Sequence, residues 1–423
     1  MIIEIMEKPL ACLEISTEAV KLLIGYELSG QPIVLYTKTV PCHCVSADGS
    51  IQDKEALKKA LEQFHVIEDE AAKIRVAVKE VCLVLPSAGL NVYTNRKAST
   101  VVSPDYRVGK IDVNNVISQI KKEVPPQGHE IVDIIPDLFF LDQGKPTLDA
   151  PIGEKSSSLA IQAKVFVLPN AIANGYKLLL EENDFRVKSR AVAAYCYAEL
   201  FKSYKDLPTS YLLVDIGANI TTVSLIGRGS PYGAMSFARG SSSLTKKIEE
   251  SFHISKEEAE KLKCDRGYDE RRISYNPPVC QGNDEYGQKK NYLQQDLNQV
   301  IMDWLEDYAP LLKQAVTSAL RNMRDGQDQI PMLLTGGGSK LFGLKRLLAN
   351  YCQGREIQVV APRSIGARDP SFGAMLGLLM GRAHYRGSLE ESKTGVVSVM
   401  REAEEKDKKP AKRRKDNEED DIL

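Results

Sequence analysis

The sequence predicts an α/β fold of two related lobes, and three segments carry this prediction. Residues 212–226 read as an apolar strand, a sharp polar turn and a second apolar strand, which should pair antiparallel. Residues 11–26 show the same order of strand, polar turn and strand. Residues 330–351 run from an apolar strand through three consecutive glycines into an apolar helix. A hairpin that recurs in each half, with a late glycine turn, indicates two related lobes that face one another.

Length and composition exclude several classes of protein. With 423 residues, 43% of them hydrophobic, the chain can bury a large core and should form more than one domain. A net charge of −1 gives no polyelectrolyte signature, so we expect no nucleic-acid partner. No apolar run is long enough to span a bilayer and no signal-peptide pattern opens the chain, so we expect a cytoplasmic protein.

The eight cysteines are scattered among apolar residues. This placement favours reduced core thiols over a disulfide framework. The run Cys42-His43-Cys44 invites a metal interpretation, but no second Cys/His pair has ligand spacing, so we expect no metal there.

The first half is expected to hold an α/β lobe interrupted by a compact α+β insert, because prolines and glycines punctuate the chain between residues 87 and 165. Apolar periodicity places the elements in order. They are a helix over 53–64, a strand over 81–85, β-structure over 91–102, a helix over 112–124, two short strands over 130–141 around Pro136, a strand over 158–168, a helix over 169–182, and a helix over 187–203 after a short strand.

The second half opens with the hairpin and is then mainly helical. Ser255 with Glu258 three residues later is a helix-start signature, and the apolar stripe around Trp304 indicates a core helix. The expected elements are a small-residue turn over 240–243, helices over 244–252 and 255–263, a loop over 265–291, a long helix over 293–323, a helix over 342–351 and a small-residue core helix over 371–380.

The last residues change in composition. A basic cluster at 408–415 is followed by an acidic run at 416–421, and almost nothing apolar lies between residues 401 and 421. Such a segment cannot bury enough surface to fold, so we expect a disordered tail. The alternative is an electrostatic contact with anionic lipid, which the acidic run would partly cancel. The expected division is a first lobe over 1–86 and 166–207, the insert over 87–165, a second lobe over 208–385 with a subdomain at about 230–305, and the tail over 386–423.

Two of these segments have the residues of an anion site. A Cβ at Gly217 would block the approach of a phosphate to the turn, and the Asp215 carboxylate is suited to hold a water of a Mg²⁺ ion. Thr221 and Thr222 supply hydroxyls and restart the strand. The strand that feeds Gly336–Gly338 and a helix N-terminus favours a nucleotide cradle, since free N–H groups and the positive end of the helix dipole meet there.

The order of these hairpins, Thr335 with its three glycines and the terminal helix together resemble the actin-like ATPase superfamily. Within it, the chain resembles the FtsA family of bacterial cell-division proteins over residues 10–382. The segments that carry the narrower resemblance are Gly240 with Leu244-Thr245, an A-E-x-x-K helix at 259–263, and the insert runs 109–116, 130–136, 140–142 and 151–153 with Leu159.

The resemblance implies roles for individual residues, with ATP and Mg²⁺ as cofactors. The first phosphate turn would consist of Glu14, Ser16 and Thr17. The second would consist of Asp215, Gly217, Asn219 and Thr221, with Asp215 on the metal, and Gly240 would belong to the nucleotide site after it. Glu260 and Lys263 would contact ribose and base, and Gly336, Gly337 and Gly338 would line the adenosine pocket.

The first turn departs from the family pattern of Asp-Ile-Gly-Ser or Asp-Ile-Gly-Thr. Glu14 replaces the aspartate, which moves the carboxylate by one methylene, and Ser16 replaces the glycine. If the turn requires a positive φ at Ser16, strain of about 1–2 kcal/mol is expected there. Ser241 also stands where a second glycine is usual. We therefore hypothesise that ATP binds but turns over slowly or not at all.

As a member of that family the protein would be an ATP-binding actin homologue that forms filaments, binds the C-terminal peptide of the tubulin-like protein FtsZ and contacts other division proteins. It would lie at the inner face of the membrane at the division site, although the tail lacks the family's amphipathic helix. One alternative is a scaffold like the pilus-assembly protein PilM. Another is a sugar or acid kinase, for which we find no second acidic site beside the hairpins except Glu14.

Overall fold

The computed structural model describes residues 9–69, 74–272, 275–321, 323, 329–352, 354–386 and 397–399. The first lobe is built on a five-stranded sheet with the strand order β10-β6-β1-β2-β3. Strand β1 (Leu10–Ile15) pairs antiparallel with β2 (Ala19–Leu28) and parallel with β6 (Glu80–Leu85). Strands β3 (Gln31–Pro41) and β10 (Arg186–Val192) form the two edges. Every residue of β6 is buried, as is typical of a central parallel strand covered on both faces.

The second lobe repeats this topology in a six-stranded sheet of order β13-β12-β11-β17-β18, with β14 beside β12. Strand β11 pairs antiparallel with β12 and parallel with β17, which pairs parallel with β18. These strands hold the places of β1, β2, β6 and β10, so the predicted two-lobed α/β fold is confirmed. The bounds are β11 Ser210–Ile216, β12 Thr221–Gly227, β13 Ser230–Pro231, β14 Met235–Phe237, β17 Met332–Thr335 and β18 Ile357–Val359.

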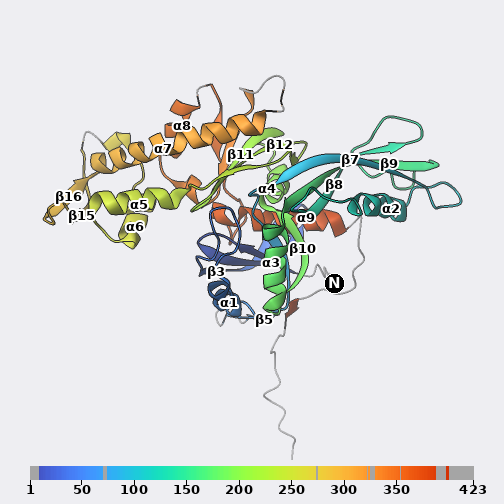
Figure 1. Ribbon diagram of the computed structural model, residues 1–423, viewed down its shortest axis with the longest axis horizontal. Coiled ribbons are helices and arrows are strands. Elements are labelled where there is room, and N and C mark those ends of the chain that lie inside the picture. Colours follow the sequence, from blue (N-terminus) through green and yellow to red (C-terminus); the bar gives the residue numbers. More distant parts are fainter. Residues whose placement is uncertain are drawn as a thin grey trace, which may run out of the picture.

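Helices cover both sheets (Figure 1). The helices of the first lobe are α1 Lys54–Glu62, α3 Asn170–Glu182, α4 Ala193–Lys202 and α9 Gly373–Arg386. The helices of the second lobe are α5 Ser241–Phe252, α6 Lys256–Asp265, α7 Gln294–Leu320 and α8 Leu344–Tyr351. Helix α9 is the last helix among the described residues, but it packs on α4 and on the first sheet. Within the part of the chain that the structure describes, no helix is long and apolar enough to cross a bilayer.

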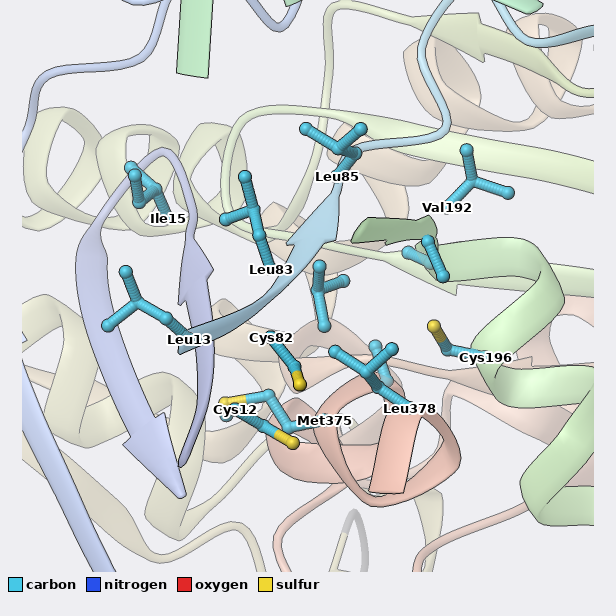
Figure 2. Packing of buried hydrophobic residues seen from close by; sticks show 14 of the residues in the cluster. Cys12, Leu13, Ile15, Cys82, Leu83, Leu85, Val192, Cys196, Met375 and Leu378 are labelled. Atoms are coloured by element: carbon cyan, nitrogen blue, oxygen red, sulfur yellow. The ribbon is translucent and has the colours of Figure 1, made fainter. Parts of the chain in front are cut away.

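The core of the first lobe contains several thiols, as expected from the sequence. Cys12 of β1 and Cys82 of β6 are register partners, so their side chains lie on one face of the sheet. Figure 2 shows them beside Met375 of α9, with Leu378 of α9 and Cys196 of α4 close by. All five of these side chains are at most 3% exposed. The described cysteines are free thiols.

The insert forms its own layer beside the first lobe (Figure 1). Its antiparallel sheet has the order β7-β9-β8, and α2 packs on it over a separate apolar core. The bounds are β7 Asn91–Thr100, α2 Lys110–Lys121, β8 His129–Leu141 and β9 Ser158–Pro169.

The prediction of two short strands around Pro136 is wrong. Strand β8 is continuous, and its register against β9 shifts between Pro136 and Leu138. A bulge of this kind lets proline remain within a strand although it has no N–H to donate.

Two other expected elements differ in the structure. The helix expected over 187–203 begins at Ala193, because Arg186–Val192 instead joins the sheet as β10, parallel to β6. The expected loop over 265–291 contains a 3₁₀ turn at Glu270–Arg272 and a hairpin of β15 (Pro278–Asn283) and β16 (Lys289–Leu293). Tyr292 of this hairpin stacks on Phe252 with 4.1 Å between ring centroids. Contacts between distant segments decided both cases.

The segment after Arg386 contains one described element. Strand β19 (Val397–Val399) pairs antiparallel with β5 (Ile74–Val78), which also pairs with β4 (Val66–Asp69). The expectation of disorder from residue 386 onward is therefore wrong at these three residues, where an open strand edge offers backbone partners. The basic cluster and the acidic run lie outside the described residues.

Candidate functional site between the two lobes

A cavity of about 640 Å³ lies between the two polar turns and is lined by both lobes. Its volume falls in the range of small-molecule sites. The predicted site residues that line it are Glu14, Ser16, Thr17, Asp215, Gly217, Glu260, Lys263, Gly336, Gly337 and Gly338. The structure thus brings together both hairpins, helix α6 and the glycine turn, which are far apart in the sequence.

The two turns share one backbone geometry. The Ser16 N–H donates to Ala19 O at 2.9 Å, and the Gly217 N–H donates to Ile220 O at 2.9 Å. The strain expected at Ser16 is not present, because Ser16 is not among the described residues with a positive φ. Its hydroxyl instead donates to Ala19 O at 2.9 Å and accepts from the Ala19 N–H at 3.2 Å. The serine therefore closes the first turn with its own side chain.

Two carboxylates, those of Glu14 and Asp215, line the cavity together with Lys21. Lys21 is the register partner of Glu14, and its Nζ lies 3.5 Å from Glu14 Oε2 and donates to Ser371 O at 2.9 Å. Burial raises the pKa of Asp215 to about 7; the charge of Glu14 adds to this rise, and Lys21 opposes it. An added cation would favour the ionised form of Asp215.

A metal ion bound here would need ligands beyond the protein. Within the described ranges, no group of three or more His, Cys, Asp or Glu residues is placed to hold one. Mg²⁺ is commonly bound by one or two carboxylates together with phosphate oxygens and water. Glu14 and Asp215 fit that pattern, and the carboxyl pair with its raised Asp215 pKa is the observation that supports it.

The three glycines allow a close approach of the strands and leave one open face. A Cβ on Gly336, whose φ is +80°, would lie 2.3 Å from Asp215 Oδ1, and a Cβ on Gly338 would lie 2.5 Å from Ile216 Cγ2. A Cβ on Gly337 would meet nothing within 4 Å, although this residue lines the cavity. Gly337 therefore presents bare backbone to the cavity, as a ligand cradle requires.

The helix expected over 342–351 is present and begins two residues later than expected. Residues Gly337–Lys340 make a 3₁₀ turn, and α8 starts only at Leu344 after Gly343. The positive end of the α8 dipole, which was expected at the glycines, thus lies several residues further along the chain.

Helix α6 presents a fixed ionic network to the cavity wall. It begins with the predicted capping box of Ser255 and Glu258. The Lys263 Nζ, on a side chain that is 8% exposed, donates to Glu260 Oε2 at 2.7 Å and to Thr245 Oγ1 at 2.9 Å. Burial would raise the pKa of Glu260, but the hydrogen bonds from Lys263 and Thr245 outweigh it and lower the pKa. These hydrogen bonds favour the ionised form of Glu260 and orient both side chains beside the cavity.

Three predicted site residues do not line the cavity. Thr221 is fully buried, and its Oγ1 donates to Arg239 O at 2.7 Å and lies 3.0 Å from Tyr308 Oη. Gly240 packs on the second turn, where a Cβ would lie 2.4 Å from Gly217 O. Asn219 Nδ2 donates to Glu18 Oε1 at 3.2 Å. These residues shape or bridge the turns.

Helix α5 starts three residues earlier than expected because the second turn supplies acceptors for its first N–H groups. The N–H groups of Ser241 and Ser242 donate to Gly217 O and Ala218 O at 3.0 and 2.9 Å. Helix N-termini leave such donors without partners inside the helix. This contact fastens the second turn to the helix that follows it.

Sequence reasoning missed several side chains of the cavity. Lys21 lies opposite Glu14 in the hairpin, so counting back from the turn in both strands would have found it. Trp304 was assigned to the core, and it is 3% exposed, yet it also lines the cavity and its Nε1 donates to Ser243 Oγ at 2.8 Å. Lys340 and Asp369, which pair at 2.6 Å, had no local signal because their contact joins distant segments.

The chain is similar to known proteins over most of its length. A family model described as cell division protein FtsA matches residues 212–377, and one described as the SHS2 domain inserted in FtsA matches residues 89–167. The cell division protein FtsA of Streptococcus pneumoniae is 22% identical over 90% of this chain and 80% of that protein. The FtsA of Bacillus subtilis is 24% identical over 87% of this chain and 82% of that protein.

Solved structures show the same fold at low identity. A PilM–PilN type IV pilus biogenesis complex matches with a TM-score of 0.55 and 17% identity, over 88% of this chain and 98% of that one. MreB 5 of Spiroplasma citri bound to AMPPNP matches with a TM-score of 0.52 and 14% identity, over 90% of this chain and 98% of that one. These likenesses identify the two-lobed architecture as actin-like.

Proposed function

We propose that this chain, which belongs to the FtsA family of actin-like cell-division proteins, binds ATP with Mg²⁺ between its lobes, forms filaments and links FtsZ to the membrane. The observation that supports nucleotide binding best is the cavity of about 640 Å³ between two matching turns. Its wall includes a carboxylate from the strand before each turn and three glycines. The proposed function is inferred from this site, because proteins of one fold can have many different activities.

The residues present fit an adenine nucleotide with its phosphates toward the turns. Gly336–Gly338 would lie along the nucleoside, and Glu260 and Lys263 would donate to or accept from the ribose and base. Glu14 and Asp215 would hold Mg²⁺, which when bound offsets the charge of the phosphates. The raised pKa of Asp215 is consistent with a carboxyl group placed to meet a cation.

We expect ATP turnover to be slow or absent. Glu14 carries one methylene more than the family's aspartate, and its carboxylate lies 3.5 Å from Lys21 Nζ. A carboxylate held by a neighbouring cation is less able to orient water for attack on a phosphate. Multiple turnovers at the rate of a metabolic kinase would contradict this part of the proposal.

Substitution of Gly337 by valine tests the nucleotide site. The new side chain would enter the cavity without meeting protein atoms, since a Cβ there has no neighbour within 4 Å. We expect the variant to fold normally and to lose MgATP binding by more than about tenfold in calorimetric titration. Gly175→Val is the control, because a Cβ there also has open space but Gly175 does not line the cavity. Equal binding by both variants would place the nucleotide elsewhere.

The hairpin β15–β16 and the turn before it support a peptide partner. Tyr275 and Tyr286 are 82% and 86% exposed within the second-lobe subdomain at about 230–305. Exposed aromatic side chains frequently anchor binding partners. We propose that the FtsZ C-terminal peptide docks on this subdomain. Fluorescence anisotropy of the labelled peptide should show weaker binding to Tyr286→Ala than to the unchanged chain, and unchanged anisotropy would exclude this contact.

We further propose a peripheral contact with the inner face of the membrane and contacts with other division proteins. The basic cluster at 408–415 would meet anionic lipid at roughly 1 kcal/mol per basic residue. Flotation of the full chain with phosphatidylglycerol vesicles, and not with phosphatidylcholine vesicles, would support this contact. Failure to float with either would leave the membrane link to a partner.

The likeness to a PilM–PilN complex keeps a pilus-type scaffold as the second candidate. Imaging a fluorescent fusion in dividing cells separates the two. We expect a ring at the division site that is lost when FtsZ is depleted. Polar or diffuse signal independent of FtsZ would favour the scaffold, and phosphorylation of a small hydroxylated substrate would favour a kinase.

A further inference from the structure

The Glu18 side chain reaches from the first turn to the second lobe. Its Oε1 accepts from Asn219 Nδ2 at 3.2 Å and from Ser242 Oγ at 3.3 Å, and its Oε2 lies 3.1 Å from His43 Nδ1. Asn219 belongs to the second turn and Ser242 to the start of α5, so two of these three contacts join the lobes. Glu18 also lines the cavity. One carboxylate thus engages polar groups from both sides of the site.

Glu18 lies within the first turn, among the groups that would face a polyphosphate. Both turns have four residues, because Ile15 pairs with Val20 and Ile216 pairs with Thr221. Among the described residues, the amides of Thr17 and Glu18 have no hydrogen-bond acceptor within this turn, so they are available to an anion. An acidic side chain at this place repels an anion that the backbone could otherwise hold.

The surroundings favour a negative charge where the Glu18 carboxylate lies. Ser242 is in the first turn of the twelve-residue helix α5, whose N-terminus carries the positive end of the helix dipole. Asn219 and Ser242 each contribute one neutral donor. A terminal phosphate bridging the same two turns would need these donors and the same positive potential, so it would compete with Glu18.

We propose that the Glu18 carboxylate takes the place of a terminal phosphate between the lobes, so that the lobes are joined without one and the site takes a nucleoside diphosphate in preference to a triphosphate. This inference rests on the proposed nucleotide site. It assigns to one side chain of this chain the contact that a third phosphate would make.

Equilibrium titration with MgADP and MgATP tests the preference. For the full chain, MgADP should bind about tenfold more tightly than MgATP, and Glu18→Gln should remove this difference by strengthening MgATP binding. The control is Glu62→Gln, which changes charge equally at an exposed residue of α1 outside the cavity lining. Glu18→Ala is a second variant in which both the charge and the hydrogen bonds are lost. Circular dichroism melting confirms that each variant is folded.

Small-angle X-ray scattering of the nucleotide-free chain tests separately whether Glu18 joins the lobes. Glu18→Ala and Ser242→Ala should each give a larger radius of gyration than the unchanged chain, since each removes a contact between the lobes. Equal radii would overturn the role of Glu18 in closure. A MgATP preference in the unchanged chain, or a preference that Glu18→Gln leaves intact, would overturn the role in nucleotide choice.

Failure of the nucleotide site itself has a different result. If neither nucleotide binds the unchanged chain or any variant, the proposed nucleotide function and the diphosphate preference both fail. The scattering result then still decides whether Glu18 joins the lobes.

Discussion

The two polar turns have the same backbone and different side-chain chemistry. Both are four-residue turns closed by one N–H to O bond of 2.9 Å. The first is closed a second time by the hydroxyl of Ser16, whereas the second has Gly217 at that place and is held by the N-terminus of α5. The duplicated topology therefore preserves the backbone path, while different hydrogen bonds stabilise each of the two turns. Substitutions should affect the two turns unequally.

The largest expected effect is at Gly240, which packs on the second turn. In Gly240→Ala the new Cβ would lie 2.4 Å from Gly217 O and 2.5 Å from Ala218 O, and both are backbone atoms that cannot move aside cheaply. We expect a loss of about 3 kcal/mol in the free energy of unfolding, measured with urea. Gly175→Ala in α3 is the control and should gain about 0.5–1 kcal/mol from helix propensity. Equal stability of the two variants would show that the turn and α5 separate readily.

The next effect concerns the carboxyl of the second turn and depends on pH. The pKa of Asp215 is about 7 in the fold, against about 3.9 for an ordinary aspartate, so the folded state retains a proton that the unfolded chain has lost. The contribution of this proton to the free energy of unfolding is complete below about pH 4. It decreases as the pH rises toward 7 and is absent at higher pH. Asp215→Asn should therefore stabilise the nucleotide-free chain at pH 8 and should change little at pH 4. We expect a gain of about 1–3 kcal/mol, because Asp215 is only partly buried and lines the cavity.

Thermal melting at the two pH values measures this difference. Asp48→Asn is a control of opposite sign, since hydrogen bonds from Ser46 and Ser50 lower the pKa of Asp48 to about 2. That variant should lose stability at pH 8. If Asp215→Asn is also destabilising at pH 8, the Asp215 carboxylate is better compensated by Lys21 than the raised pKa indicates.

A serine placed in the second turn tests whether the two turns are interchangeable. In Gly217→Ser the Cβ would lie 2.8 Å from Ile220 O, so the turn must open slightly. We expect a loss of about 1–2 kcal/mol in the free energy of unfolding. Because α5 holds this turn through Gly217 O, the same change should also weaken nucleotide binding. A neutral result would mean that the second turn relaxes to the geometry of the first.

The reverse exchange in the first turn should have the smallest effect. Ser16→Gly removes the hydroxyl that donates to Ala19 O, at a cost of about 0.5–1.5 kcal/mol, and relieves no backbone strain because φ at Ser16 is not positive. Urea unfolding of this variant beside Gly217→Ser gives the comparison directly. A gain in stability would show that Ser16 strains its turn after all.

Much of the fold was predictable because its determinants are local. The hairpins, the capping box before α6 and the apolar periods of α1 and α7 each depend on residues close in sequence. The elements that were wrong depended on partners far away: β10 on β6, and the hairpin β15–β16 on Phe252. For β10, strand pairing with the distant β6 overrides the local helical pattern.

The sequence by itself determined that two strand-turn-strand units and a late glycine turn exist, because alternation of apolar residues and the conformational freedom of glycine are properties of short segments. Only the tertiary structure decided that Thr221 turns into the core, that the charges of Glu14 and Lys21 both act on Asp215, and that Glu18 crosses to Asn219 and Ser242. The direction of each of these side chains depends on which hydrogen-bond partners and charges other segments of the fold bring close to it, and the local sequence does not determine those distances.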